Sequence, residues 1–314
     1  MKSFMVGTRG SNLALKQTEE VISLIRDFYP GIEIKTKVIK TTGDRLKDAP
    51  IKTLGNKGVF VKEIEEALAG EEIDLAVHSL KDLPAELPPG LMLGAVTRRE
   101  DPRDAWISNK NIPLSQLPTG STIGTSSLRR AAQLSHYFPD ITIFPLRGNL
   151  PTRLKKTFQF EGIVLAMAGL KRMGLNHYVT EVISPEICLP SVGQGGLGIE
   201  IRENDEQSAA LVENIHHNQT WKRVKAERAF QRELEGGCQA PIAGFASIDK
   251  QTSTGEPVLS LSGMVAGTEG KPFFREEIKG DPSQCEELGK QLARDLLKKG
   301  AGKILNELRS RGDL

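Results

Sequence analysis

The stretch Ser121–Tyr137, STIGTSSLRRAAQLSHY, decides the fold class of this chain. Ser121–Thr125 is expected to form a short strand, and small and hydroxyl residues then lead into Leu128–Tyr137, where apolar residues recur at helical spacing. The same strand-to-helix succession recurs on both sides of this stretch. Strands that alternate with helices predict α/β units on mainly parallel sheets.

The pattern extends from this stretch in both directions. The other predicted strands of this kind are Phe4–Thr8, Ile32–Val38, Ile73–Val77, Ile141–Leu146 and Gly162–Ala166, and the helices are Asn12–Phe28, Val59–Ala69 and Leu150–Phe158. The last third differs, because its helices and strands are grouped. It is predicted to contain helices Asp205–Asn214 and Thr220–Glu235, strands Ile242–Ile248, Val258–Val265 and Phe273–Ile278, and a closing helix Pro282–Arg309. This order predicts a small α+β domain.

The composition excludes several classes of protein. Of 314 residues, 38% are hydrophobic and 26% charged, which excludes a mainly disordered chain, a collagen and a long coiled coil. Lys plus Arg is 42 and Asp plus Glu is 40, so the net charge of +2 does not favour a nucleic-acid binder. No apolar run approaches the ~20 residues of a membrane span, and no secretory signal is recognised. We therefore expect a cytoplasmic protein that binds neither nucleic acid nor membrane.

Metal and disulfide chemistry are not expected. The three cysteines are too far apart for a disulfide framework or a zinc site, which favours a reducing compartment. None of the five histidines has metal-ligand spacing with another ligand. The chain also has no phosphate-binding GxxxxGK[ST] loop and no GxSxG serine elbow.

Arginines and hydroxyls gather where predicted strands enter helices. The four junctions are VGTRGS at Val6–Ser11, IGTSSLRR at Ile123–Arg130, LRGNLPTR at Leu146–Arg153 and VGQGG at Val192–Gly196. Helix N-termini offer free N–H groups, and arginine adds a fork of donors that matches a carboxylate or a phosphate. Several such turns would form a site for a ligand with several negative groups. The alternative is ordinary helix capping with solvated arginines, and the pattern does not separate carboxylate from phosphate.

Two further residues are candidates for chemistry. Asp82 follows the buried strand in IDLAVHSLKDLP, beside Lys81, and is either a general acid or cation stabiliser or a turn-capping residue. Cys238 in LEGGCQAPI follows two glycines, which suits an accessible, reactive thiol. Cys188 lies in an apolar context typical of an inert thiol, and Cys285 carries no functional signal.

These segments together resemble the porphobilinogen deaminase (hydroxymethylbilane synthase) family. The matching stretches are TRGSNLAL, GNKGVFVKE, DLAVHSLKDLP, REDPRDAW, GTSSLRRAAQL, LRGNLPTRL, AGLKR, LPSVGQGGLGIE, AERAF and LEGGCQAPI, in this order from residue 8 to residue 242. The resemblance implies a transferase that condenses porphobilinogen head to tail, with release of ammonia, to the linear tetrapyrrole hydroxymethylbilane of porphyrin and haem biosynthesis. It also implies a dipyrromethane cofactor, made from the substrate and held through a thioether.

The resemblance assigns roles to individual residues. Cys238 matches the attachment residue, and Asp82 matches the catalytic carboxylate that stabilises the cationic azafulvene formed as ammonia leaves. The positions that match cofactor- and substrate-binding residues are Arg9, Ser11, Lys57, Lys81, Thr125, Ser126, Ser127, Arg129, Arg130, Arg147, Gly148, Arg153, Arg172, Gln194 and Arg202. Thr53 stands where many members have a second lysine of the lid loop Thr41–Gly58, and Gly10 stands where glutamine is usual. No metal is implied.

The resemblance also implies an architecture. Two similar α/β domains, related to type II periplasmic binding proteins, flank a cleft, and a small C-terminal α+β domain carries the cysteine. The first domain is expected to comprise residues 1–96 and 196–216, the second 97–195 and the third 217–314. A monomer is expected. A binding-protein-like anion receptor would need the arginines but not Cys238, and a nucleotide-dependent enzyme would need a phosphate loop that the chain lacks.

Overall fold

The chain folds into two compact units. The computed structural model describes residues 3–45, 60–234, 240–250 and 255–310. One unit comprises Met1–Glu100 and Gly196–Trp221, and the other comprises Asp101–Gly195 and Lys222–Leu314. The chain therefore leaves the first unit, builds part of the second, returns, and leaves again.

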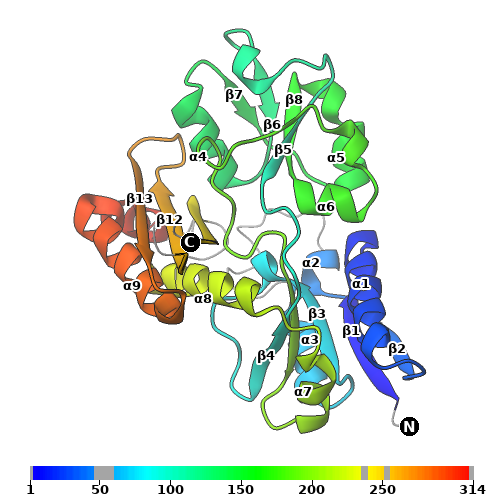
Figure 1. Ribbon diagram of the computed structural model, residues 1–314. Helices are drawn as coiled ribbons and strands as arrows, with labels where there is room; N and C mark the ends of the chain where they lie inside the picture. Colours follow the sequence, from blue (N-terminus) through cyan, green and yellow to red (C-terminus); the bar gives the residue numbers. More distant parts are fainter. Residues whose placement is uncertain (1–2, 46–59, 235–239, 251–254, 311–314) are drawn as a thin grey trace. The chain divides into compact units, whose positions relative to one another are not determined.

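The first unit is built on one five-stranded sheet. Its strands, in spatial order, are β2 (Ile34–Ile39), β1 (Phe4–Arg9), β3 (Leu75–Ser79), β10 (Leu197–Arg202) and β4 (Leu91–Val96). Strand β1 pairs in parallel with β2 and β3, whereas β10 runs antiparallel to β3 and β4. The sheet is thus mainly parallel, as predicted, with one antiparallel strand where the chain returns (Figure 1).

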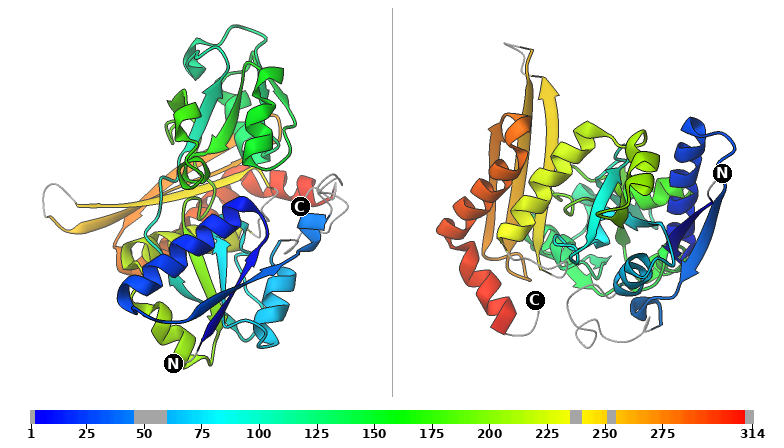
Figure 2. Two further views of the ribbon diagram at one scale, coloured as in Figure 1. Left: turned by 90° about the vertical axis from the view of Figure 1, so that its right-hand side faces the viewer. Right: turned by 90° about the horizontal axis from the view of Figure 1, so that it is seen from below.

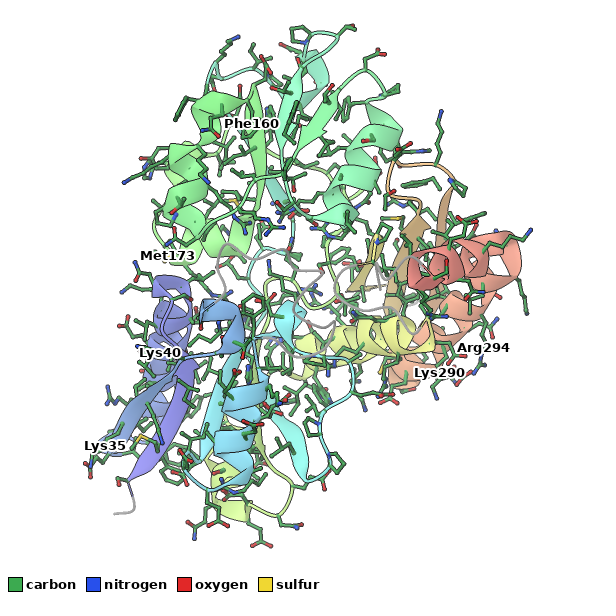
Figure 3. The ribbon with its side chains drawn as sticks, turned by 180° about the vertical axis from the view of Figure 1, so that it is seen from behind. Lys35, Lys40, Phe160, Met173, Lys290 and Arg294 are labelled. Carbon is green, nitrogen blue, oxygen red and sulfur yellow. The ribbon has the colours of Figure 1, made fainter. Side chains whose placement is uncertain are left out.

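Helices cover both faces of this sheet because successive strand residues alternate between faces. Leu75 and Val77 of β3 pack with α1 (Asn12–Phe28), whereas Ala76 packs with α3 (Lys62–Ala69). The remaining helices of the unit are α2 (Thr42–Arg45), η2 (Leu80–Asp82), α7 (Glu206–Glu213) and the start of α8 (Asn218–Glu233). Lys35 lies on the edge strand β2, and Lys40 directly follows that strand (Figure 3). Charged side chains at a sheet edge disfavour pairing with another sheet.

The second unit repeats the same strand order. Its five-stranded sheet runs β7 (Thr142–Phe144), β6 (Thr122–Gly124), β8 (Gly162–Ala166), β5 (Asp104–Ser108) and β9 (Glu181–Val182). Here β5, the strand by which the chain enters, takes the antiparallel place that β10 holds in the first sheet. The helices beside it are α4 (Leu128–Tyr137), α5 (Leu150–Lys155) and α6 (Met167–Arg172), with short helices η3 (Leu114–Gln116), η4 (Thr157–Gln159) and η5 (Asn176–Tyr178).

The C-terminal part of the second unit is a three-stranded antiparallel sheet covered by helices. Its strands are β11 (Ile242–Lys250), β12 (Pro257–Ala266) and β13 (Phe273–Gly280), followed by η6 (Pro282–Gln284), α9 (Cys285–Leu296), η7 (Leu297–Ala301) and α10 (Gly302–Ser310). Figure 2 shows β11 and β12 as a long hairpin. Phe230 of α8 packs against this sheet so closely that a Cβ at Gly263 would meet its ring at 2.6 Å.

The predicted fold class is confirmed by these three sheets. Strands β4, β5 and β10 were not expected, because they carry no clean apolar alternation. The closing helix Pro282–Arg309 is wrong as one element, since Gly300 adopts a φ of +115° and breaks it. The three-domain boundaries stay a prediction. No helix among the described residues is long and apolar enough to cross a membrane.

Candidate active site

In the first unit, Arg9, Lys81 and Asp82 lie at one edge of the sheet. Arg9 ends β1, and Asp82 lies in η2 immediately after β3. Parallel strands end at the same edge, so these side chains start from neighbouring positions. Ser79 pairs with Leu197, which places the beginning of β10 at this edge too.

The turn that carries Asp82 is anchored by apolar residues on both sides. Leu80 and Leu83 are each 2% exposed, whereas the Asp82 side chain is exposed. The Leu80 N–H donates to the carbonyl of Gly196 at 3.1 Å. A Cβ at Gly198 would approach Leu80 within 2.8 Å, so glycine there makes room for the turn. The turn that carries Asp82 is therefore held in place by residues that have no part in chemistry.

A small cavity of about 60 Å³ opens beside this turn. Its lining combines the ends of β1, α1 and β3 with Asp82, namely Arg9, Ser11, Leu13, Ala14, Gln17, Phe60, Val61, Val77, His78, Ser79 and Asp82. Ser11 caps the N-terminus of α1, because its Oγ accepts a hydrogen bond from the Ala14 N–H at 3.2 Å. Gln17 and Ser79 exchange hydrogen bonds at 2.8 and 3.0 Å, which fixes α1 against the end of β3.

Arg9 is paired with a carboxylate that the sequence reasoning did not single out. Its Nη2 donates to Asp44 at 2.6 Å, and its guanidinium lies 4.2 Å from the centre of the Phe60 ring. Burial raises the pKa of Asp44, but the hydrogen bond and charge of Arg9 outweigh it and hold that pKa below its ordinary value. Asp44 closes the stretch TTGD after β2, and nothing in that stretch distinguishes it from a loop residue.

Of two further predicted binding residues, Lys81 lies beside Asp82 and Arg202 lies far from it along the sheet. Lys81 is half-buried beside Asp82 in η2. Arg202 lies at the other end of β10, paired with Leu91, and so at the opposite edge of the sheet. Its guanidinium donates to the carbonyls of Leu68 and Ile73 and to the carboxylate of Asp205 at 2.9, 2.7 and 2.5 Å. The structure does not bring Arg202 together with Asp82.

A buried ionisable cluster lies on the α3 face of the same sheet. His78 Nε2 and Glu200 Oε2 are 2.9 Å apart, and the two residues are 5% and 0% exposed. Glu65 of α3 has one oxygen buried with no hydrogen-bond partner among the described residues. Burial and, secondly, the negative charge of Glu200 raise the pKa of Glu65 to about 7.

This shift makes the stability of the folded chain depend on pH. The folded pKa of Glu65 is above its unfolded value, so its stabilising share is fully present below about pH 4.5 and is lost as pH rises to about 7. We expect Glu65→Gln to remove this dependence. Denaturant titration measures the free energy of unfolding of both chains. From about pH 4.5 to about 7, that of the variant should rise relative to that of the parent chain.

Glu66→Gln is the matched control for this prediction. Glu66 is the next residue on α3, and its side chain is 63% exposed in an ion pair with Lys62. It should leave most of the pH dependence in place, because burial and the charge of Glu200 raise the pKa of Glu65 more than the charge of Glu66 does. A Glu65→Gln chain that loses stability with pH as steeply as the parent chain would contradict the shift.

In the second unit the predicted residues again gather at one sheet edge. Strands β6, β7 and β8 are parallel, and β5 begins beside their ends because Asp104 pairs with Ala166. The hydroxyl groups after β6 form hydrogen bonds with nearby main-chain groups. Ser126 Oγ donates to Leu146 O at 2.9 Å, and Ser127 caps α4. Thr125 is 5% exposed, and its Oγ1 accepts from the Ser127 N–H at 3.2 Å.

Arg129 and Arg130 converge on Asp104, a fully buried carboxylate. Their Nη2 atoms lie 2.8 and 2.7 Å from its two oxygens. Burial raises the pKa of Asp104, but the charges of Arg129 and Arg130 more than offset it and hold that pKa well below its usual range. The two arginine side chains are only 6% and 7% exposed, so they are not the solvated arginines of the alternative interpretation.

Two neutral residues complete this network. Gln194 Nε2 donates to Asp104 at 2.9 Å, and the Cys188 thiol donates to the other oxygen at 3.3 Å. Burial raises the pKa of Cys188 to about 12, which favours the protonated thiol, and its buried position agrees with the expected inert role. Two guanidinium charges face one carboxylate, so the network holds one net positive charge inside the unit.

The other predicted binding arginines of this unit lie nearer the surface. Arg147 is exposed at the residue after Leu146, and Gly148 follows with a φ of +120° that favours glycine. Arg153 of α5 donates through Nε to the Gly148 carbonyl at 2.7 Å. Arg172 donates to the Gly195 carbonyl at 3.1 Å, next to Gln194.

Two predicted residues, Lys57 and Cys238, lie outside the described residues. The described residues on either side of Cys238, Leu234 and Ala240, are buried at 1% and 4% exposure. Leu234 receives a hydrogen bond from Arg309 at 3.2 Å. Within the described ranges, no group of three or more His, Cys, Asp or Glu side chains could hold a metal ion.

Sequence reasoning missed Asp44, Asp104 and Asp205, which pair with predicted arginines of the described residues. Asp104 lies in REDPRDAW next to Arg103, and Asp101 lies two residues before the same arginine. Local sequence offers no means to tell a buried carboxylate from a surface one. A faint signal existed only in the apolar residues that follow Asp104, which predict that it enters a buried strand.

Comparison with known proteins gives consistent matches over almost the whole chain. Residues 4–210 match the family model described as porphobilinogen deaminase, dipyromethane cofactor binding domain, and residues 221–298 match the porphobilinogen deaminase C-terminal domain. A porphobilinogen deaminase of Bacillus subtilis is 47% identical over 313 residues, covering 98% of this chain and 97% of that protein. One of Syntrophobacter fumaroxidans is 46% identical over 305 residues, covering 96% and 97%.

Solved structures with a related arrangement are more distant. The BenM effector binding domain with its effector benzoate aligns at a TM-score of 0.41 and 16% identity, covering 68% of this chain and 90% of that one. The periplasmic aliphatic sulphonate binding protein SsuA of Escherichia coli aligns at 0.40 and 15%, covering 75% and 71%. These likenesses add nothing to the assignment of function.

Proposed function

The chain belongs to the porphobilinogen deaminase family, and we propose from that premise that Asp82 is its catalytic carboxylate and Cys238 its cofactor-attachment residue. The protein is a transferase that polymerises porphobilinogen, with release of ammonia, to hydroxymethylbilane in tetrapyrrole biosynthesis, and it uses a dipyrromethane cofactor. The observation that carries this assignment is the match of both family models over residues 4–210 and 221–298.

The donor set of the second unit fits a cofactor that carries carboxylates. The Asp104 network keeps one net positive charge, and Arg130 Nε is buried with no hydrogen-bond partner among the described residues. Arg147 adds an exposed guanidinium at the same sheet edge. When bound, the dipyrromethane supplies the pyrrole end on which the chain grows. The arginines would hold its acetate and propionate groups by charge-assisted hydrogen bonds.

Asp82 is suited to stabilise a cation. Asp82 is exposed and lines the same cavity as Arg9, Gln17 and Ser79. As ammonia leaves porphobilinogen, positive charge develops on the substrate's pyrrole and methylene group. A carboxylate held in a fixed turn stabilises that charge without having to reorient.

The proposed carboxylate-binding residues divide by unit. Arg9, Ser11, Lys57 and Lys81 belong to the first unit, and Thr125, Ser126, Ser127, Arg129, Arg130, Arg147, Gly148, Arg153, Arg172 and Gln194 belong to the second. Arg202 leaves this set, because its hydrogen bonds and its sheet edge favour a role in holding the end of α3. In this proposal, a carboxylate of the ligand replaces Asp44 as the partner of Arg9.

We propose in addition that the enzyme works as a monomer in the cytoplasm and binds no nucleic acid. The near balance of 42 basic and 40 acidic residues supports the last point. The two described cysteines are both free and buried, which is typical of a reducing compartment. Sedimentation analysis and cell fractionation test the oligomeric state and the compartment.

Intact-protein mass measurement tests the attachment residue. The purified chain should weigh more than its sequence by two pyrrole units, and Cys238→Ser should remove that increment because a hydroxyl cannot form the thioether. Cys285→Ser, which changes a buried thiol without an assigned role, should keep it. A Cys238→Ser protein that still carries the increment would refute the assignment.

A further inference from the structure

The second unit holds another fully buried carboxylate, which the proposed chemistry does not use. Glu227 of α8 is 0% exposed. Its Oε2 accepts from the Gly193 N–H at 2.7 Å, and its Oε1 accepts from the Ala246 N–H at 2.8 Å. One side chain thus ties the turn after Val192 to strand β11.

A buried carboxylate is costly unless its oxygens receive good hydrogen bonds. The two main-chain bonds of Glu227 are short and charge-assisted, so they meet this condition and hold their donors firmly. The turn that it holds needs support, because Gly193 and Gly195 both adopt positive φ, +70° and +89°. Glycines at these positions have many other conformations available.

Gln194, the residue between these glycines, contacts the carboxylate that pairs with both arginines. Gln194 Nε2 donates to the carbonyl of Pro102 at 2.7 Å and to Asp104 at 2.9 Å. Asp104 in turn holds Arg129 and Arg130. Hydrogen bonds, joined by the peptide link between Gly193 and Gln194, therefore connect α8 to both guanidinium groups.

We infer that Glu227 is a positioning residue for Arg129 and Arg130, and that it acts through the Gly193–Gly195 turn and Gln194. This inference rests on the proposed role of that pair in binding carboxylates.

Glu227→Gln tests the inference in the holoenzyme. Glutamine presents an NH₂ group to one of the two main-chain N–H donors, so one hydrogen bond is replaced by a clash of donors. The loosened turn should release Gln194, and Cys188, which is buried against Asp104, should then react with a maleimide at least about tenfold faster, the size of one lost charge-assisted hydrogen bond. Peptide mapping distinguishes Cys188 from the other thiols. The KM for porphobilinogen should rise by a similar factor, with kcat less affected.

Glu233→Gln is the matched control on the same helix. Glu233 accepts from Arg294 Nε of α9 at 2.9 Å, on a partly exposed surface. Arg294 is labelled in Figure 3. This variant should lower stability slightly and leave both the Cys188 rate and KM unchanged. If Glu227→Gln does not fold, Gln194→Ala should accelerate Cys188 and raise KM in its place, since it removes the amide that joins the turn to Asp104.

The outcomes separate this inference from the function on which it rests. Arg129→Leu should raise KM whether or not Glu227 has a positioning role. Suppose that Arg129→Leu raises KM, whereas Glu227→Gln loses stability but keeps Cys188 protected and KM unchanged. The inference is then overturned and the function stands. If Cys188 becomes reactive in Glu227→Gln but neither variant alters KM, the carboxylate-binding role of the arginines is overturned, and the inference with it.

Discussion

Asp82→Asn is expected to lower turnover at least ~100-fold while the chain remains folded. Asparagine has nearly the same shape as aspartate but carries no charge to stabilise the cation that forms as ammonia leaves. The turn should survive, because Leu80 and Leu83 bury its apolar side and Asp82 itself is exposed. The loss should therefore appear in kcat and not in the free energy of unfolding.

The measurement is steady-state formation of hydroxymethylbilane by protein that has first been shown by mass to carry the cofactor. Glu86→Gln is the control, since Glu86 is an exposed carboxylate near the same turn and does not line the cavity. It should retain turnover within about twofold of the parent chain, as an exposed charge is largely screened. Near-normal turnover in Asp82→Asn would mean that another group stabilises the cation.

Asp104→Asn is expected to destabilise the second unit by about 3–5 kcal/mol. The substitution leaves two guanidinium groups buried without the carboxylate that both contact, at 2.8 and 2.7 Å. It also turns an amide NH₂ toward Gln194 or Cys188, which now donate to the aspartate. Denaturant titration followed by circular dichroism measures the loss.

Asp101→Asn provides the comparison for this prediction. Asp101 also pairs with an arginine, Arg103, at 2.7 Å, but that arginine side chain is 44% exposed. The Asp101 side chain is 13% exposed, but solvent reaches its arginine partner and screens the pair, so this variant should lose clearly less stability than Asp104→Asn. Equal losses in the two variants would show that burial of the Asp104 network is not what makes it stabilising.

Much of the secondary structure could be predicted because it depends on local rules. Helix α1 has the predicted bounds Asn12–Phe28, with Ser11 as its cap, and α4 has the bounds Leu128–Tyr137, with Ser127 as its cap. Strand β8 likewise matches Gly162–Ala166. Spacing of apolar residues and the chemistry of the cap are properties of neighbours in sequence.

The antiparallel strands could not be predicted in this way. Strands β5 and β10 enter or re-enter a sheet after a long excursion, and their partners lie far away in the chain. Strand β10 contains the buried Glu200, and β5 begins with the buried Asp104, so neither shows a simple apolar pattern. Their place depends on pairing partners that only the folded sheet supplies.

By itself, the sequence determined the alternating α/β organisation, the smaller α+β part and the types of residue at each strand end, because apolar periodicity and helix caps act over a few residues. Only the tertiary structure decided which charges are paired. It joined Arg9 to Asp44, set Arg129 and Arg130 on one buried carboxylate, and moved Arg202 to the opposite sheet edge. The physical reason is that the energy of a charge depends on its burial and its distance from other charges, and those quantities exist only once distant segments have packed together.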